Sequence, residues 1–388
     1  MKKGMRNIKK LGRIKFPKGI DLTKLKTQPR NSGGKGMSIS DEFVDQWFIL
    51  SDNKTLAIYK TYDNLSLTCP VAKSVKNIRM YNELLCGKVC ELMGIDHAKY
   101  ERAHTDDTDG LISHNILSEH ESLAPIIMDT SKLGEFVELL REKEKVSEDK
   151  LREIVQVLYT YMLFDIRTLQ TDRNRNNAPL VRHKVTGELS VGELIDCEYS
   201  YLVNNMIRLQ KGGDDFFGVF DRKKPIDTQA IIEAYDTKMG YGSYYSLNVY
   251  MCLEERTLEN RIEEVCSLAA MSPELGEIYD LFMSSFDIRK AISELEKEGV
   301  VASKPYREYI LAIDDYVKTR MEYHRSISQD SAKKYTESKP EEIRGLGDRA
   351  EIMHMLDMAR SGSRTVASQV LDNYDIYYRN VNHHGPLH

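Results

Sequence analysis

The chain has 388 residues, of which 41% are hydrophobic and 30% are charged, and its formal net charge is −5. This composition is typical of a globular protein with two or three lobes and excludes an intrinsically disordered chain. The acidic balance argues against a protein whose main role is to coat nucleic acid.

The sequence contains neither a secretory signal pattern nor an apolar run long enough to cross a bilayer. We therefore expect a cytoplasmic protein, or a secreted effector that leaves the cell by a route not visible in the sequence. The six cysteines are scattered and form no C-x-x-C pair. They indicate neither a zinc site nor a disulfide framework, and Cys86 and Cys90 are interpreted as buried thiols on a helix.

The chain begins with a lysine- and arginine-rich stretch. Residues 1–30 are predicted to form a basic, solvated arm, with contact to an acidic partner or to the substrate as the alternative. A glycine-rich stretch follows, and it contains Gly33, Gly34, Lys35 and Gly36. Such a loop can direct backbone N–H groups at phosphate, but it lacks the Walker pattern, so a plain linker is the alternative.

Two hairpins and one helix are predicted next. Residues 45–62 alternate as two strands around a polar turn, and Lys60 shares a face with apolar residues of the second strand. Residues 76–94 carry an apolar stripe at helical spacing and end at Gly94, while Glu83 lies off that stripe, where most glutamates are simply solvated. Residues 97–117 form the second hairpin, with Asp109-Gly110 as its turn signal.

Beyond Ser131 the pattern becomes mostly helical. The predicted helix Glu148–Arg167 leads directly into the stretch 169–200, and further helices are expected near 228–239, 245–270, 273–283, 288–297 and 306–324. Residues 327–346 are polar and are interpreted as a linker or a frayed helix. The terminal pair His383-His384 has no further ligand at fitting spacing and is interpreted as a tail.

The stretch 169–200 contains the strongest chemical pattern. Asp172 and Asn177 have the spacing D-x-x-x-x-N, and the β-like run 193–195 ends on Asp196. Phosphoryl transfer from ATP needs one carboxylate that orients the attacking hydroxyl, and an amide oxygen and a second carboxylate that hold the metal. Hard oxygen ligands of this kind suit Mg²⁺.

The segment TDRNRNN resembles the catalytic loop of the phosphatidylinositol-kinase-like superfamily, and most closely that of its bacterial HipA-like branch. Ile195-Asp196-Cys197 resembles the metal-binding segment of the same family. The sequence departs from the family pattern twice. Asn174 stands where a histidine is usual, and Cys197-Glu198-Tyr199-Ser200 contains no glycine, which affects the expected rate and metal geometry.

This resemblance implies an α+β, two-lobed, protein-kinase-like fold with a nucleotide cleft between the lobes. The N-lobe, an antiparallel sheet plus one helix, is expected at residues 31–120. A mostly α-helical C-lobe is expected at 121–325, followed by a polar linker and tail at 326–388. A parallel sheet flanked by helices would contradict this expectation.

The resemblance also implies roles for single residues. Asp172 orients the acceptor or acts as base, Asn177 and Asp196 bind the metal, and Lys60 binds the phosphates and pairs with Glu83. Arg173 stabilises phosphate charge, with a structural ion pair as the alternative. The glycine loop Gly33, Gly34, Lys35 and Gly36 covers the phosphates, and the backbone of Leu117, Ser118 and Glu119 faces the adenine.

The resulting hypothesis is a kinase that uses ATP and magnesium to phosphorylate Ser or Thr of a protein, itself included. A phosphoinositide kinase is the second hypothesis, with Arg222-Lys223-Lys224 as the only basic candidate for a lipid-facing patch. The third is a nucleotide-binding pseudokinase or scaffold, which Asn174 and Cys197-Glu198 favour. Neither a nucleic-acid partner nor a membrane is strongly indicated.

Overall fold

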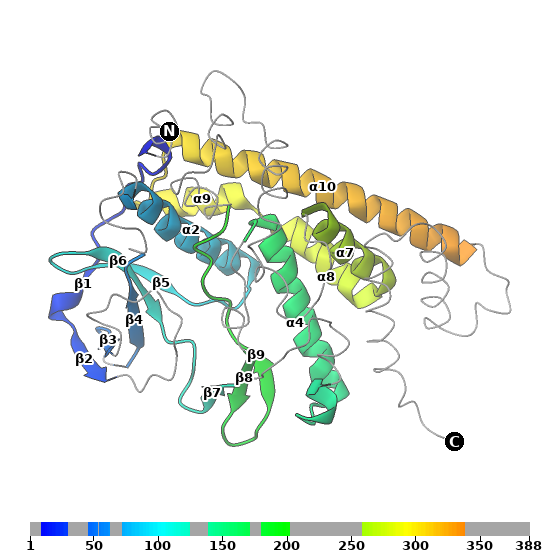
Figure 1. Ribbon diagram of the computed structural model, residues 1–388, viewed down its shortest axis with the longest axis horizontal. Helices are drawn as coiled ribbons and strands as arrows, with labels where there is room; N and C mark the ends of the chain where they lie inside the picture. Colours follow the sequence, from blue (N-terminus) through cyan, green and yellow to red (C-terminus); the bar gives the residue numbers. More distant parts are fainter. Residues whose placement is uncertain are drawn as a thin grey trace.

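The computed structural model describes residues 9–29, 46–52, 54–62, 72–124, 139–170, 180–201 and 258–337. Within these ranges, the strands come from the first 191 residues and most of the helices come from later residues (Figure 1). The predicted two-lobed α+β fold, with a largely antiparallel sheet and a helix before a mostly helical part, is confirmed. Gly33, Gly34, Lys35, Gly36, Asp172, Arg173, Asn177 and the basic run 222–224 lie outside the described residues.

A six-stranded sheet forms the centre of the N-terminal lobe, with the strand order β1-β5-β6-β4-β3-β2. The predicted hairpins are present as β3 (Gln46–Ile49) with β4 (Leu56–Lys60), and β5 (Tyr100–His104) with β6 (Asp109–His114). These pairs are antiparallel, as is the pairing of β4 with β6. The parallel pair is β1 with β5.

The N-terminal segment differs from the predicted solvated arm. β1 (Ile20–Asp21) and β2 (Lys26–Pro29) belong to the sheet and are joined by a short 3-10 helix, Leu22–Lys24. Lys15 forms two backbone hydrogen bonds of 2.9 Å with Val301, and the Leu11 side chain is buried. Apolar residues are spaced between the lysines, so the segment packs its apolar side chains while the cations face solvent.

The role predicted for Gly110 is also corrected. The β5–β6 turn closes earlier, where the Thr105 N–H donates to the Thr108 carbonyl at 2.8 Å, and Gly110 lies within β6 opposite Ala103. A Cβ atom at Gly110 would lie 2.2 Å from the Lys60 carbonyl oxygen and 2.6 Å from the Tyr59 ring. Glycine is therefore required here by close packing against β4.

A second, three-stranded sheet follows the first one along the chain. β7 (Glu121–Leu123) pairs with β8 (Leu180–His183), which pairs with β9 (Leu189–Val191), all antiparallel. A strand–turn–strand unit, β8 and β9, thus follows the D-x-x-x-x-N motif. The predicted strand at 193–195 is instead a single bridge between His97 and Leu194, because the backbone turns away at Asp196, whose φ is +56°.

Long helices form the other part of the fold: α2 (Ala72–Met93), α4 (Glu148–Arg167), α7 (Leu258–Met271), α8 (Pro273–Ser285), α9 (Ile288–Lys297) and α10 (Lys304–Glu337). α4 has the predicted bounds, and Gly94, with φ +71°, ends α2 as predicted. α10 continues through residues predicted as a linker, because no glycine or proline interrupts 325–337. None of the helices in the described ranges combines the length and apolar character needed to cross a membrane.

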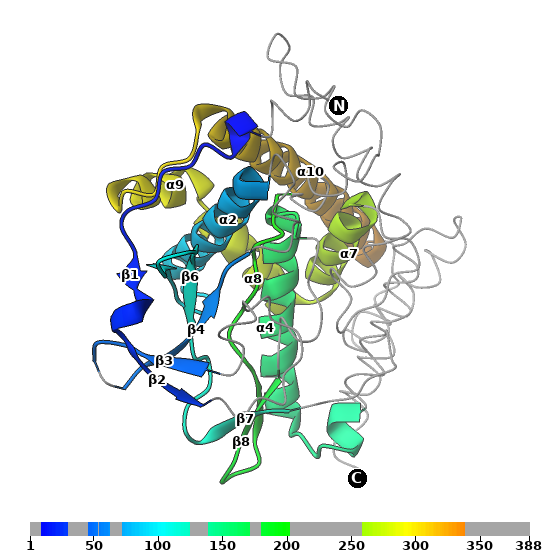
Figure 2. The ribbon, with the colours of Figure 1, turned by 60° about the vertical axis from the view of Figure 1, so that its left-hand side comes forward.

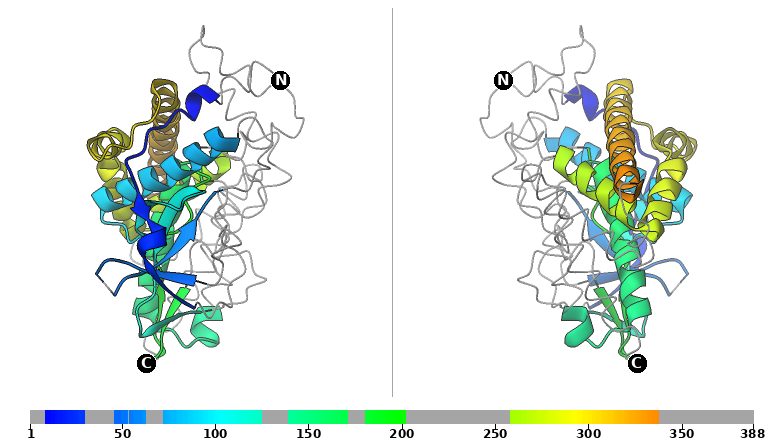
Figure 3. Two further views of the ribbon diagram at one scale, coloured as in Figure 1. Left: turned by 90° about the vertical axis from the view of Figure 1, so that its left-hand side faces the viewer. Right: turned by 90° about the vertical axis from the view of Figure 1, so that its right-hand side faces the viewer.

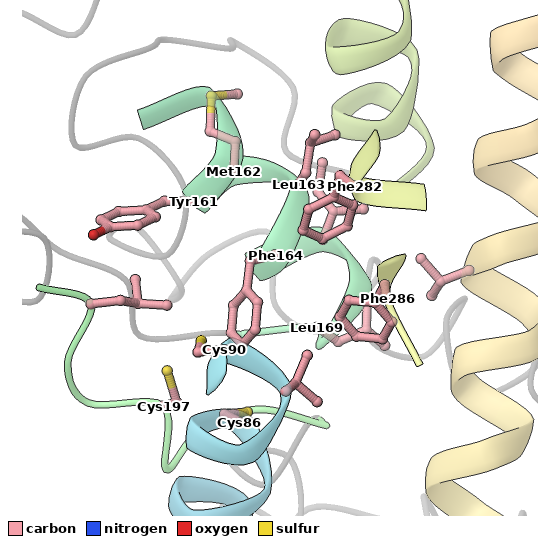
Figure 4. Close-up of a cluster of buried hydrophobic side chains, with 14 of the residues drawn as sticks. Cys86, Cys90, Tyr161, Met162, Leu163, Phe164, Leu169, Cys197, Phe282 and Phe286 are labelled. Carbon is pink, nitrogen blue, oxygen red and sulfur yellow. The ribbon is translucent and has the colours of Figure 1, made fainter. Parts of the chain in front are cut away.

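Helix α2 lies between the sheet and the helical part (Figure 2). Its apolar side chains join the main core formed with α4, α7, α8, α9 and α10, whereas the sheet has a smaller core around Phe48 and Tyr59. Figure 3 shows α10 alongside α7 from either end. Figure 4 shows Cys197 among the core residues next to Cys86 and Cys90 of α2 and Phe164 of α4. The segment that carries Asp196 is thereby anchored where the two parts meet.

Candidate active site

Lys60, at the end of β4, is the centre of a buried charge cluster. Its side chain is 2% exposed, and its Nζ atom forms an ion pair with Asp196 Oδ1. The same nitrogen lies 3.7 Å from Glu83 Oε1 and 3.8 Å from Glu198 Oε2. The structure therefore brings Lys60, Glu83 and Asp196 together from three separate segments, and these contacts include the Lys60–Glu83 pair that the resemblance implied.

Aromatic side chains also lie next to the Lys60 ammonium group. The Lys60 Nζ atom lies 5.1 Å from the ring centroid of Tyr62 and 5.6 Å from that of Tyr100. Such cation–π contacts add electrostatic attraction without adding a competing charge. The carboxylates therefore remain the groups that determine the orientation of the Lys60 ammonium group.

Helix α2 presents one polar face to the segment after Asp196. Arg79, Asn82, Glu83 and Cys86 recur at the i, i+3, i+4 and i+7 spacing of one helix face. Each of the four contacts the stretch 197–200 through a hydrogen bond. The apolar stripe in the sequence predicted that one side of α2 is buried. It did not predict that this second, polar side is buried as well.

Arg79 and Glu198 form a second ion pair next to Lys60. The Arg79 guanidinium donates to Glu198 Oε1 at 2.5 Å and to the Tyr62 carbonyl at 3.1 Å. It also lies 4.8 Å from the centroid of the Tyr199 ring. Both side chains of the pair are almost fully buried, at 0% and 6% exposure. Sequence reasoning missed both Arg79 and Glu198. Arg79 lies one helical turn before Glu83, and Glu198 lies two residues after Asp196.

The backbone at Asp196 has an unusual conformation that is held by its neighbours. Its φ of +56° is rare for a residue with a side chain. The Asp196 N–H donates to the Tyr100 hydroxyl at 3.2 Å, and its carbonyl accepts from Gln170 Nε2 at 2.6 Å. Glu83 Oε1 accepts from the Cys197 N–H at 3.3 Å. Strained residues of this kind concentrate at functional sites, where the surrounding structure fixes them.

The cluster holds three carboxylates against two cations. Burial raises the pKa of Glu83 to about 7, Lys60 opposes that shift, and Asp196 and Glu198 add to it. Burial alone would lower the pKa of Lys60, but Asp196 and Glu83 raise it well above its ordinary value. Lys60 is thus a permanent cation, and burial favours the protonated form of the Glu83 carboxyl group.

The donor atoms suit a hard cation. Glu83 Oε2 and Glu198 Oε2 are buried without a hydrogen-bond partner, and the Asp196 side chain, at 15% exposure, is the most accessible of the three acids. Mg²⁺ takes one or two protein carboxylates at a site, and Asp196 is a carboxylate of that kind. Within the described ranges, no three or more His, Cys, Asp or Glu side chains are grouped so that together they could hold a metal ion. Asn177, the other predicted ligand, lies outside them.

The stretch predicted to face adenine links the two sheets, between β6 and β7. The Leu117 carbonyl accepts from Asn115 Nδ2 at 2.8 Å, and the Ser118 N–H donates to Glu121 Oε2 at 2.8 Å. Lys184 donates to the Glu119 carbonyl at 2.8 Å. The stretch thus connects the two sheets, and local side chains hold its backbone groups.

The sequence matches no protein-family model and no curated protein. Among solved structures, the chain is similar to the Helicobacter pylori proinflammatory kinase CtkA, with a TM-score of 0.47 and 11% identity over 80% of this chain and 99% of that one. It is also similar to HipA from the Shewanella oneidensis MR-1 toxin–antitoxin complex with HipB and operator DNA, with a TM-score of 0.37 and 9% identity over 84% and 72%.

Proposed function

We propose that this chain is a kinase that transfers the γ-phosphate of ATP to a serine or threonine of a protein, itself included. The observation that carries the proposal is the buried Lys60 ammonium, paired with Glu83 and in contact with Asp196. A buried lysine positioned by a helix glutamate next to a metal-binding aspartate is the arrangement that phosphoryl transfer uses.

Each residue of the cluster has a distinct task in this proposal. Lys60 neutralises charge on the phosphates, and Glu83 fixes the direction of its ammonium group. Asp196, together with Asn177, would hold magnesium, which would supply positive charge to neutralise the charge that develops on the phosphates. Asp172 orients the hydroxyl of the acceptor, and Arg173 adds positive charge beside it. Gly33, Gly34, Lys35 and Gly36 cover the phosphates, and the backbone of 117–119 binds the adenine.

The chemistry of the cluster explains why Lys60 suits phosphate better than a surface lysine does. Its ammonium is already removed from water, so little further desolvation accompanies contact with a phosphate. The raised pKa keeps it charged throughout the physiological range. A phosphate that accepted a hydrogen bond from Lys60 in place of Asp196 would leave the Asp196 carboxylate available to a metal ion.

The proposal is tested by incubating the chain with ATP labelled at the γ-phosphate and Mg²⁺, alone, with cell lysate and with phosphoinositide vesicles. We expect label on the chain or on lysate protein, at Ser or Thr. Label on lipid would contradict the protein acceptor and favour the phosphoinositide kinase. ATP binding without any transfer would contradict the kinase and favour a pseudokinase.

Matched variants distinguish phosphoryl transfer by this site from transfer by a contaminating enzyme. Lys60→Met and Asp196→Ala should both lower transfer by at least roughly 10²-fold, the scale for a preorganised charge at a reaction site. Lys24→Met removes an exposed lysine of the same lobe and should leave transfer unchanged. Undiminished transfer by Lys60→Met would show that Lys60 is not part of the site.

A further inference from the structure

A buried asparagine joins helix α2 to the segment that carries Asp196. Asn82 is fully buried, and its Nδ2 atom donates to the Ser200 carbonyl at 2.7 Å and to the Glu198 carbonyl at 3.4 Å. Its Oδ1 atom accepts from the Tyr306 hydroxyl of α10 at 2.5 Å. Both ends of the amide are therefore occupied, and the orientation of the side chain is fixed.

Helix α10 makes a second contact with the same segment. The Tyr309 hydroxyl donates to the Tyr201 carbonyl at 3.0 Å. Tyr306 and Tyr309 lie one turn apart on α10, and their rings stack at a centroid distance of 6.0 Å. The two hydroxyl groups thus form a pair of anchors on one face of the helix, and both are fully buried.

The segment 196–201 depends on these anchors because it forms no strand. Asp196 and Tyr201 both have positive φ, at +56° and +55°, so the segment begins and ends in a costly conformation. Buried carbonyl groups need partners, and no sheet ladder supplies them here. Asn82 and Tyr309 take that place for the carbonyls of Glu198, Ser200 and Tyr201.

We propose that Asn82, Tyr306 and Tyr309 are positioning residues that fix the Asp196 carboxylate for metal binding, so that α10 sets the magnesium affinity of the site. This inference rests on the proposed function, since it assigns Asp196 to the metal. α10 begins 108 residues after Asp196, yet only two hydrogen bonds separate Tyr306 from the backbone around that aspartate. Removing outer partners of metal ligands typically lowers metal affinity roughly 10–100-fold.

The test uses Tyr→Phe variants of the full chain, because they remove one hydroxyl group and keep the ring. Tyr306→Phe and Tyr309→Phe are compared with Tyr279→Phe. The Tyr279 hydroxyl is also buried and donates to a backbone carbonyl, that of Met321, at 2.9 Å, but it lies between α8 and α10 away from the site. The control therefore loses the same kind of hydrogen bond without touching residues 196–201.

The first readout is amide hydrogen exchange without any ligand. Tyr306→Phe and Tyr309→Phe should accelerate exchange at Cys197, Ser200 and Tyr201 about fivefold, the factor that one net hydrogen bond contributes. Tyr279→Phe should leave these three amides at the wild-type rate. Equal acceleration in all three variants, or none in the two α10 variants at these amides, would overturn the proposal.

The second readout is the magnesium concentration that half-saturates binding of a non-hydrolysable ATP analogue, measured by calorimetry. We expect it to rise about tenfold in Tyr306→Phe and to stay constant in Tyr279→Phe. An unchanged value in Tyr306→Phe would refute the positioning role. If wild-type protein bound no magnesium–nucleotide complex at all, the proposed function would fail, and hydrogen exchange would still decide whether α10 holds the segment.

Discussion

Among the single residues, the charge cluster combines Lys60 and Arg79 with three acids, and these five residues come from three segments of the chain. The sequence pointed to Lys60, because it alternates with apolar residues, and to Asp196, because an apolar run precedes it. Glu83 followed from the family resemblance, not from its position off the apolar stripe. Arg79 and Glu198 escaped sequence reasoning because they are 119 residues apart, and no local pattern encodes a pairing over that distance.

The raised pKa of Glu83 predicts a pH dependence of stability. The folded protein holds a proton on Glu83 up to about pH 7, whereas the unfolded chain releases it near pH 4.5. The wild type should therefore lose stability relative to Glu83→Gln as the pH rises from 4.5 to 7. Urea unfolding of both proteins at pH 5 and pH 8 measures the difference.

The control for this prediction lies on the same helix. Glu91→Gln alters an exposed side chain and gives the background pH dependence of such a substitution. A Glu83→Gln difference that does not change with pH beyond this background would contradict the charge balance described for the cluster.

A close contact at Gly110 supports the position of Lys60. Gly110→Ala places a Cβ atom against the Lys60 carbonyl and the Tyr59 ring, and should destabilise the fold by about 1–3 kcal/mol. Gly187→Ala meets no atom within 4 Å, and its cost of about 1 kcal/mol comes only from its positive φ. Urea unfolding compares the two. A Gly110→Ala variant as stable as the wild type would show that β4 can shift, and that Lys60 is not fixed by the sheet.

At the scale of elements, the sequence predicted best where one face of an element is apolar. α4 has the expected bounds because its apolar spacing is regular and Ser147 caps its first turn. β1 and β2 were missed because short apolar spacings within a lysine-rich stretch resemble a solvated arm. The run at 193–195 is not a strand because its pairing ends after one bridge, which depends on the backbone turn at Asp196.

The end of α4 makes a testable contact with α10. Arg167 Nη2 donates to Asp314 at 2.5 Å, and both side chains are buried. Asp314→Ala leaves the Arg167 charge buried and unpaired, which should cost about 3–5 kcal/mol. Thermal or urea unfolding measures this loss.

The neighbouring residue, Asp315, provides the matched comparison for the Asp314→Ala variant. Asp315 pairs with Arg289 at 3.0 Å, but both side chains are 61% exposed. Asp315→Ala should therefore cost at most about 1 kcal/mol, the range of surface ion pairs. Similar losses in the two variants would mean that Arg167 finds another partner and that the pair does not anchor α4.

At the scale of the whole molecule, the two-lobed arrangement joins the sheet to the helices through α2. Its apolar side belongs to the helical core, and its polar side holds the Asp196 segment. The α+β class was predictable from the switch between strand and helix periods. The placement of α2 was not, because it depends on packing with α9 and α10, which lie about 200 residues later in the chain.

In the proposed kinase, Asp196 binds metal together with ATP, whereas Asp172 acts only on the acceptor. Calorimetry of ATP binding in Mg²⁺ tests it most directly with wild type, Asp196→Ala, Asp172→Ala and the exposed control Asp315→Ala. We predict metal-dependent binding by wild type, Asp172→Ala and Asp315→Ala, and its loss in Asp196→Ala. Equal loss in the Asp172 and Asp196 variants would make Asp172 a metal ligand, and wild-type binding by Asp196→Ala would contradict the account.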